Sequence, residues 1–407
     1  MKKAYIIFLT VLCVCVLAWF LPWLYSLALP DADNDPFLAY SPIADTFVIS
    51  ESGDNPKIYL QSDTEKTFSK EERDSLLPQI YFTQLSARMQ LPDTIGGKAL
   101  TIPNFKHSQW VFTSMPMDVN KVQPAWHFIM ESMPKRVDLE DPTEVFSLDG
   151  DKVTFIDMAT NEINAKRSQR FTKAFSDKGF AYPAKYLSAN ITSRKAYDEG
   201  YLLVGDNGDV FHMKMRAGTP YVAKIAMPDS VKAEQAFIME NNDRRVLGLI
   251  FDGKHNVYAL DRDGYRLTKL PIEDIDPTRD RISVMASLFN IVFRARNAEE
   301  VRWTAIDTDT YDLLGSYTKA YKPGAAQRAA QWIFPFSISF SSVDDSYAFP
   351  RIEDISYKAL ALNVLLAIAT FIIMRRRRKG QYTALICSMC TLIFGIFLFI
   401  PTIILDK

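Results

Sequence analysis

Two hydrophobic patterns divide this 407-residue chain. Predominantly apolar runs occupy 4–29, 356–374 and 382–405, close to its two ends. Between them, shorter stretches alternate apolar and polar residues with a period of two, as β-strands with one buried face do. The patterns therefore predict apolar helices at both ends of the chain and a mostly β domain between them.

Four stretches of the middle region repeat one order of elements, in which strands alternate with polar turns. They are 144–161, 201–218, 246–270 and 290–317. Several of the turns contain Asp-Gly or Asn-Gly, which favour hairpins. The first turns of successive stretches begin 57, 46 and 45 residues apart. Units of three or four strands at intervals of about 45 residues are typical of β-propeller blades.

We expect these repeats to build a β-propeller-like domain of six to eight blades, and a pair of β-sandwiches is the alternative. Further blades are expected in 46–63 and 108–131, and 332–349 could supply closing strands. A helical insertion is expected at 163–180, where the interval between repeats is longest.

A second helix is expected at 69–90, interrupted near Pro78. Ser69 and Glu72 stand three residues apart at its start. This is the spacing of a capping box, in which each side chain bonds the backbone N–H of the other residue. The stretch 322–330 is expected to be a surface loop or a short helix.

The first apolar run, 4–29, contains no charged residue and is long enough to span a bilayer. Trp19, Trp23 and Tyr25 cluster toward its second half, as side chains at a membrane interface do. We interpret the run as an uncleaved anchor. A cleaved signal peptide is the alternative, with Ser26-Leu27-Ala28 as the cleavage site.

Basic residues next to the apolar runs predict the topology. They are Lys2, Lys3, Arg375, Arg376, Arg377, Arg378 and Lys379. The positive-inside rule places such residues in the cytoplasm. The expected order is a cytoplasmic start (1–3), a transmembrane anchor (4–29), an extracytoplasmic domain (30–355), a transmembrane helix (356–374), a cytoplasmic basic loop (375–381), a third transmembrane helix (382–405) and an extracytoplasmic end (406–407). The last two helices would form a hairpin, and Asn363 is expected to face another helix.

The charge balance bears on the partners. The middle of the chain, 30–356, holds all but nine of the 47 Lys and Arg and all but one of the 48 Asp and Glu, so acids exceed bases there by nine. Because phosphate backbones require a basic face, nucleic acid is not expected as a partner. The cysteines are Cys13, Cys15, Cys387 and Cys390, all in apolar runs. The middle domain therefore has no disulfide, and we interpret Cys387-x-x-Cys390 as a pair of inert apolar residues.

Candidate chemistry is sparse. His212, together with Met115 and Met117, has the soft side chains that copper(I) prefers. The alternative is that alternate Met residues near His212 form the buried face of a strand. The acidic clusters Asp31-x-Asp33-x-Asp35, Asp261-x-Asp263 and Asp307-x-Asp309 resemble parts of calcium loops, but tight turns use the same residues. We find no catalytic motif or nucleotide fingerprint, and neither enzymatic activity nor a cofactor is expected.

The layout resembles an uncharacterised family of membrane-anchored extracytoplasmic proteins from Bacteroides-like bacteria. The resemblance rests on the N-terminal anchor, the large domain and the C-terminal helix pair around the sequence RRRRKG at 375–380. Charge and hydropathy predict a location in the bacterial inner membrane, with several spans and a periplasmic main domain. Members look like neighbours of ABC-type export components, which implies a membrane complex as partner beside the lipid bilayer.

The expected function is accordingly that of an interaction or accessory protein of a membrane complex such as an ABC-type exporter. The alternatives are a small-molecule or metal-binding module in extracytoplasmic maturation, and a hydrolase of envelope polymers. Propeller-like domains suit the first function because they present a broad, rigid face with loops.

Overall fold

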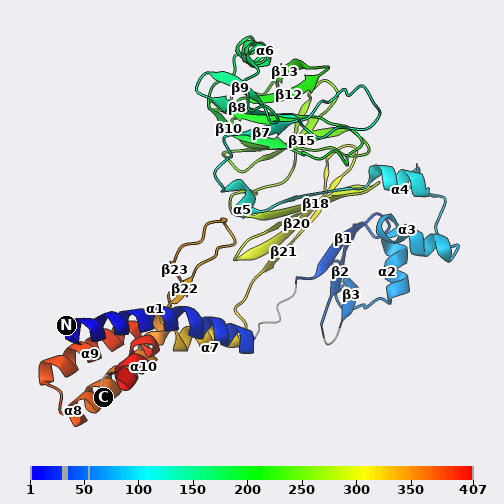
Figure 1. Cartoon of the computed structure of the whole chain (residues 1–407). Helices are drawn as coiled ribbons and strands as arrows, with labels where there is room; N and C mark the ends of the chain where they lie inside the picture. Colours follow the sequence, from blue (N-terminus) through cyan, green and yellow to red (C-terminus); the bar gives the residue numbers. More distant parts are fainter. Residues whose placement is uncertain (1, 30–34, 54–55, 406–407) are drawn as a thin grey trace. The chain divides into compact units, whose positions relative to one another are not determined.

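The computed structural model describes residues 2–29, 35–53 and 56–405 and divides into two compact units (Figure 1). The β unit spans Pro36–Ala320, and the helical unit comprises Met1–Asp35 and Tyr321–Lys407. The segment 321–355, which lies within the predicted extracytoplasmic domain 30–355, thus groups with the apolar helices.

Antiparallel sheets of three to five strands build the β unit. They are β1–β3 (Phe37–Ser41, Thr46–Glu51, Lys57–Leu60), β7–β9 (His127–Ile129, Glu144–Asp149, Lys152–Asp157), β10–β13 (Ala184–Ala189, Tyr201–Gly205, Val210–Arg216, Thr219–Lys224), β14–β17 (Ala233–Ile238, Val246–Asp252, Val257–Asp261, Leu267–Lys269) and β18–β21 (Arg281–Ala286, Asn290–Arg296, Glu300–Asp307, Leu313–Ala320) with β6 (Trp110–Ser114) at its edge. A short hairpin, β4 (Thr94–Ile95) and β5 (Lys98–Ala99), stands apart from them. The mostly β class is confirmed, and so are the strand repeats at 144–161, 201–218, 246–270 and 290–317.

Apolar side chains of consecutive sheets meet in shared cores. Phe146 of β8 and Phe211 of β12 belong to one core, Leu202 of β11 and Ile250 of β15 to a second, and Phe251 and Phe293 to a third. Full burial of each such side chain stabilises the fold by roughly 1.5–3 kcal/mol. Alternation along the strands is what supplies these faces, which is why the sequence pattern found the hairpins.

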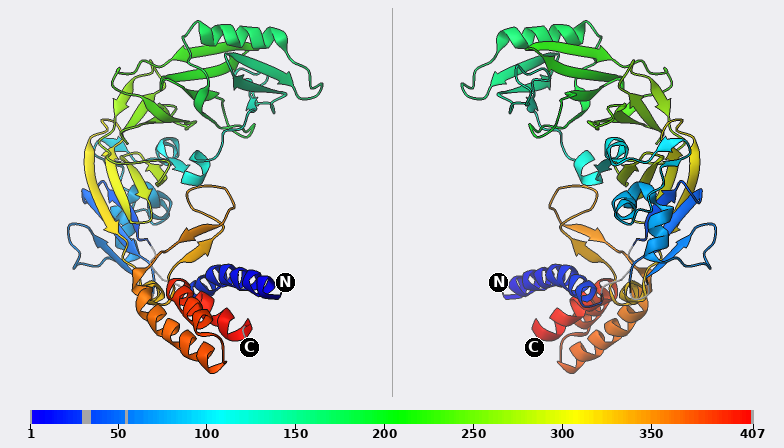
Figure 2. Two further views of the ribbon diagram at one scale, coloured as in Figure 1. Left: turned by 90° about the vertical axis from the view of Figure 1, so that its left-hand side faces the viewer. Right: turned by 90° about the vertical axis from the view of Figure 1, so that its right-hand side faces the viewer.

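The sheets of the β unit follow one another along an arc in Figure 2. The first and last sheets are joined by hydrogen bonds. The Tyr40 hydroxyl donates to the Leu314 carbonyl at 3.1 Å, and the Asn290 amide donates to the Tyr40 carbonyl at 3.1 Å. Among the residues described, five sheets of three or more strands are present and none is closed, so the predicted count of six to eight blades is not confirmed.

Two strand predictions need correction. The stretch 108–131 does not form a blade of its own, because β6 pairs with β18 whereas β7 pairs with β8. The stretch 332–349 supplies no strand to the β unit. Its strand β22 (Ser337–Ser339) pairs with β23 (Arg351–Glu353) in the helical unit, since the neighbouring Phe334 and Phe336 pack on the apolar helices.

Helices in the β unit agree with the sequence. α2 (Lys70–Leu76) and α3 (Pro78–Ala87) are separated at Leu77, and Ser69 and Glu72 form both bonds of the capping box. The insertion is α6 (Ala165–Ser176), which buries Phe171 and Phe175 in the core beside β12. Two short helices, α4 (Ile102–Ser108) and α5 (Pro116–Val119), flank β6.

The helical unit contains α1 (Lys2–Ala28), α7 (Ala325–Ile333), the 3₁₀ turn η1 (Tyr357–Ala359), α8 (Leu360–Arg376), α9 (Gln381–Phe394) and α10 (Ile396–Leu405). Of the helices described, two are long and apolar enough to cross a membrane, namely Ala4–Ala28 and Tyr357–Arg376. The stretch 322–330 is partly helical, in α7. Asn363 is buried and faces another helix, as expected, because its amide donates to the Leu392 carbonyl of α9 at 3.1 Å.

The third predicted span, 382–405, is not one straight helix. It breaks at Gly395, whose φ is +55°, into α9 and α10. A Cβ at this position would lie 2.2 Å from Oδ1 of Asn363, so the break accommodates the buried amide. α10 then returns toward the basic loop, because the Arg377 guanidinium donates to the Ile403 carbonyl at 3.0 Å.

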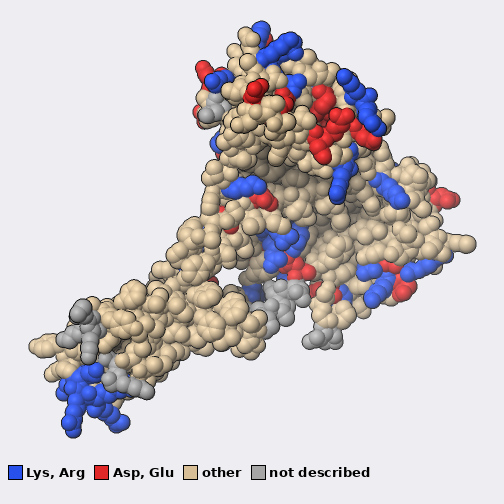
Figure 3. Space-filling view, viewed as in Figure 1, with Lys and Arg blue, Asp and Glu red and all other residues tan. Residues whose placement is uncertain are grey.

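Basic side chains gather at the end of the α8–α9 hairpin in Figure 3. They include the predicted topogenic run, of which Arg375 and Arg376 close α8 and the rest lie in the loop. Lys2 and Lys3 belong to the first turn of α1. The predicted locations of Met1 and of 406–407 fall outside the described residues, as do Asp31 and Asp33 of the first acidic cluster.

Candidate functional site

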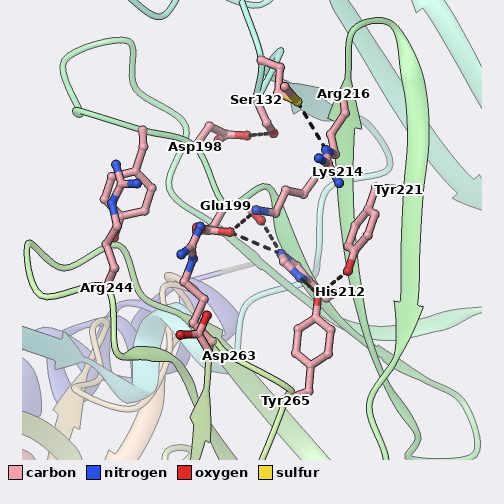
Figure 4. Close-up of a pocket in the computed structure, with 13 residues that line it drawn as sticks. Ser132, Asp198, Glu199, His212, Lys214, Arg216, Tyr221, Arg244, Asp263 and Tyr265 are labelled. Carbon is pink, nitrogen blue, oxygen red and sulfur yellow. Dashed lines mark hydrogen bonds and ion pairs between the residues drawn. The ribbon is translucent and has the colours of Figure 1, made fainter.

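The β unit holds a pocket of about 370 Å³ lined by charged and aromatic side chains (Figure 4). Its lining consists of Ser132, Met133, Tyr197, Asp198, Glu199, His212, Lys214, Arg216, Tyr221, Arg244, Arg262, Asp263 and Tyr265. These residues come from β12 and β13 and from segments adjoining β7, β11, β15 and β17. Three sheets therefore contribute to one site.

The buried Glu199 carboxylate is held between two cations. The Lys214 ammonium donates to Oε2, and Nε of Arg262 donates to Oε1 at 2.8 Å. Burial alone would raise the pKa of Glu199, but the hydrogen bonds and charges of Lys214 and Arg262 lower it below its usual value. Glu199 is therefore a carboxylate at neutral pH, with both of its oxygens occupied.

Gly200 allows the chain to bring Glu199 into this position. It precedes β11 with a φ of +67°, and a Cβ there would lie 2.2 Å from the Met213 carbonyl oxygen of β12. Only glycine tolerates both the left-handed conformation and this close approach. The residue before the strand is thereby turned toward β12, where Lys214 and His212 meet it.

A second buried cluster supports the first. The Lys195 ammonium lies 2.6 Å from Oδ1 of Asp198 and 2.7 Å from Oε1 of Glu240. The Ser132 hydroxyl donates to the other oxygen of Asp198, and the backbone N–H of Glu199 donates to Glu240 at 2.7 Å. Burial raises the pKa of Glu240, although Lys195 and the Glu199 N–H oppose the shift. The lysine and the two carboxylates fix the segment that carries Glu199.

His212 is a neutral imidazole with a hydrogen bond at each ring nitrogen. Burial lowers its pKa to about 4. Its Nε2 lies 2.6 Å from the Glu199 carbonyl, which can only accept, so Nε2 carries the proton. Nδ1 then accepts from the Tyr265 hydroxyl at 2.7 Å, and Tyr221 donates to Tyr265 at 2.8 Å. Both ring nitrogens are thus engaged.

Tyr265 reaches the histidine from a strained turn. It has a φ of +53°, which is rare for an aromatic residue. Burial and the neighbouring Tyr221 raise its pKa above the usual value, so the hydroxyl remains protonated and donates. The Asp263-Gly264-Tyr265 turn therefore serves the site as well as the hairpin.

Two further guanidinium groups line the pocket without a carboxylate partner. Arg244 lies 3.9 Å from the centre of the Tyr197 ring, and Arg216 lies 5.3 Å from that of Tyr221. Nε of Arg216 also contacts the sulfur of Met133 at 3.4 Å. Within the part of the chain that the structure describes, no carboxylate oxygen lies within 4.0 Å of either group.

Of the three candidate metal ligands, His212 alone lines the pocket. Met115 is the N-cap of α5 and Met117 is the second residue of that helix, and neither is a lining residue. Met213 and Met215 of the His212 strand point into the core, in agreement with the strand interpretation. The residues described also contain no group of three His, Cys, Asp or Glu placed to hold a metal ion.

The acidic clusters that resembled calcium loops act as turns where the structure describes them. Asp307 Oδ1 accepts from the backbone N–H groups of Asp309 and Thr310 at 2.8 and 2.9 Å. Asp261 binds Arg266 across its hairpin at 2.6 Å. These bonds satisfy the turn backbone and neighbouring cations, which is the common use of such residues.

A protein-family model matches residues 37–306 of the chain, almost all of the β unit. It is described as a domain of unknown function, DUF4857. The chain belongs to this family. Membership of an uncharacterised family, predicted from the layout, is thereby confirmed. A Bacteroides-like source and membrane anchoring of the family stay predictions. No curated protein matches the chain.

Several solved structures resemble parts of the chain. A structure of the Dos1 propeller is 13% identical over 44% of this chain and 46% of its own, with a TM-score of 0.28. The β-propeller domain of Cps50 (Swd1) from Myceliophteria thermophila is 13% identical over 49% and 57%, with a TM-score of 0.27. The chain thus spans about half the length of these two proteins. PorZ, a surface component of the type-IX secretion system of Porphyromonas gingivalis, is 10% identical over 70% and 32%, with a TM-score of 0.22.

Proposed function

We propose that the chain is a membrane-anchored extracytoplasmic accessory protein whose β unit recognises a ligand through the Glu199 pocket. Its helical unit would reside in a bacterial inner membrane, with the β unit in the periplasm. An ABC-type export complex is the candidate partner, as the family resemblance implies.

The observation that carries this proposal is the apolar surface of α1. Its side chains are exposed around the helix, for example Tyr5 at 66%, Ile7 at 64% and Phe8 at 66%. Exposing apolar surface to water costs about 25 cal/mol per Å², and contact with the hydrocarbon core of a bilayer removes that cost. α8 exposes Val364, Leu365 and Ile368 in the same way. Such helices are suited to lipid contact.

The pocket chemistry favours recognition over catalysis. A general acid or base needs a free carboxyl or imidazole whose pKa is near the working pH. Glu199 is instead paired with Lys214 and Arg262, and both nitrogens of His212 are bonded. This observation supports the binding module among the alternatives, whereas the envelope-polymer hydrolase gains no support from the pocket.

Two experiments on the tagged full-length protein test the proposal. Membranes are washed with alkaline sodium carbonate, which strips peripheral proteins, and an anchored protein stays in the pellet. A mild-detergent pull-down is then compared between the wild type and a variant with Val364, Leu365 and Ile368 changed to Asn. The proposal expects transporter subunits with the wild type and fewer with the variant. Release by carbonate would overturn the anchoring, and recovery of the chain alone would overturn the accessory role.

A further inference from the structure

The cations of the pocket fall into two classes. The three cations Lys195, Lys214 and Arg262 together balance three carboxylates, and these six residues form the Glu199 cluster: Lys214 and Arg262 with Glu199, and Lys195 with Asp198 and Glu240. Arg216 and Arg244 have no such partner among the residues described, and the remaining carboxylate of the lining, Asp263, is exposed. The N–H groups of these two guanidinium groups are therefore not taken up by a carboxylate.

Aromatic rings hold both guanidinium groups in place. Arg244 stacks on Tyr197 at 3.9 Å, and Arg216 lies over Tyr221 at 5.3 Å. Tyr221 is itself fixed by its bond to Tyr265. A guanidinium that lies against a ring keeps its N–H edge free for a planar, bidentate bond to an oxyanion. Such groups bind with little further loss of side-chain freedom.

The two arginines approach the pocket from different sheets. Arg216 ends β12, and Arg244 lies in the turn before β15 with a φ of +52°. Figure 4 shows them on different sides of Glu199. An extended ligand with two anionic groups fits this arrangement better than a single compact anion.

We infer that the pocket binds a small ligand with two oxyanion groups, such as a dicarboxylate or a phosphorylated carboxylate, one group at Arg216 and the other at Arg244. The inference rests on the proposed binding function and adds the chemical class of the ligand. The Glu199 cluster, whose charges are balanced and whose carboxylate oxygens are occupied, holds the walls of the pocket in place.

The test is isothermal titration calorimetry on the detergent-solubilised full-length protein at low ionic strength. The probes are succinate, glutarate and phosphoglycolate as ligands with two anionic groups, and acetate and glycolate as ligands with one. We expect at least one of the first set to bind, and to bind about tenfold or more tightly than either of the second. Failure of all three, or equal binding of the two sets, overturns the inference.

Arginine variants locate the site. R216Q and R244Q should each weaken binding of the best probe by about tenfold, because each removes a charge-assisted hydrogen bond. The control is R281Q, an exposed arginine of β18 outside the pocket, which should bind like the wild type. Unchanged affinity of both pocket variants would overturn the inference. The carbonate wash is independent of these residues, so failure of the anchoring proposal is recognised separately.

Discussion

Substitution of Glu199 by Gln should destabilise the β unit far more than the loss of an ordinary surface ion pair. The side chain of Glu199 is 2% exposed, and the substitution leaves Lys214, which is 14% exposed, and Arg262 without their carboxylate. Breaking a buried pair costs about 3–5 kcal/mol. Since Arg262 is 37% exposed, water compensates part of that loss, and we expect about 2–4 kcal/mol.

The matched control is Glu234→Gln. Glu234 forms an ion pair with Lys185 across β14 and β10, but their side chains are 39% and 41% exposed. An exposed pair contributes about 0–1 kcal/mol. Urea unfolding of the full-length protein, followed by tryptophan fluorescence, gives both free-energy changes. Equal effects of the two substitutions would refute the argument that the ion pairs of buried Glu199 stabilise the β unit more than an exposed pair does.

The dependence of the free energy of unfolding on pH, in the acidic range, adds a second measurement on Glu199. Because the pKa of Glu199 is lowered in the fold, its contribution is present above the pKa of an unfolded glutamate and is lost as the pH falls through the folded value. The wild type should therefore lose more stability on acidification than E199Q. Parallel curves in this acidic range would contradict the ion-pair assignment.

Three further predictions follow from particular residues. The pKa of His212 is lowered to about 4 in the folded protein, so the unfolded chain binds a proton first as the pH falls below about 6.5. The free energy of unfolding should therefore fall by roughly 1 kcal/mol per pH unit down to pH 4, and less steeply in H212N. Urea titrations at several pH values would measure both slopes. G200A should lower the melting temperature much more than G264A, since both glycines have positive φ but only the Gly200 Cβ would meet backbone, at 2.2 Å; similar losses would contradict the close approach. G395A should loosen the α9–α10 turn, seen as faster proteolysis in detergent, and Asn363→Ala should restore part of the protection because it removes the clash.

Much of the β unit could be predicted from local pattern. Alternating strands and Asp-Gly or Asn-Gly turns identified the hairpins of β8–β9, β11–β12, β15–β17 and β19–β21. Ser69 and Glu72 identified the start of α2, because a capping box depends on three-residue spacing alone. These signals depend only on neighbouring residues, and the structure contains the elements that they predict.

Pairing between distant strands was not predictable in the same way. β6 joins β18 across more than a hundred and fifty residues of chain, and nothing in its own sequence specifies that edge. The break of the third apolar run had a local signal, the glycine at 395. Its cause, the buried amide of Asn363 on α8, becomes visible only when the helices are packed.

The pocket was largely missed by sequence reasoning because its residues lie on strands and turns of three different sheets. Glu199 and Arg262 are 63 positions apart, and Arg244 belongs to a turn without a recognisable motif. His212 was singled out for a metal, whereas the structure gives it hydrogen-bond partners. The one available signal was the charged pair Asp198-Glu199 before a glycine at the start of an apolar strand.

The central claim is that the helical unit anchors a β unit outside the cytoplasm. Cysteine labelling of intact spheroplasts tests this claim most directly. All four native cysteines lie in the apolar helices α1 and α9 and can be replaced by alanine. Two single-cysteine variants, Lys178→Cys and Gln381→Cys, are then treated with a membrane-impermeant maleimide. Lys178 is exposed after α6, and Gln381 is exposed at the start of α9. The account predicts labelling of the first variant in intact spheroplasts and of the second only after lysis. Labelling of position 381 before lysis, or protection of position 178, would contradict it.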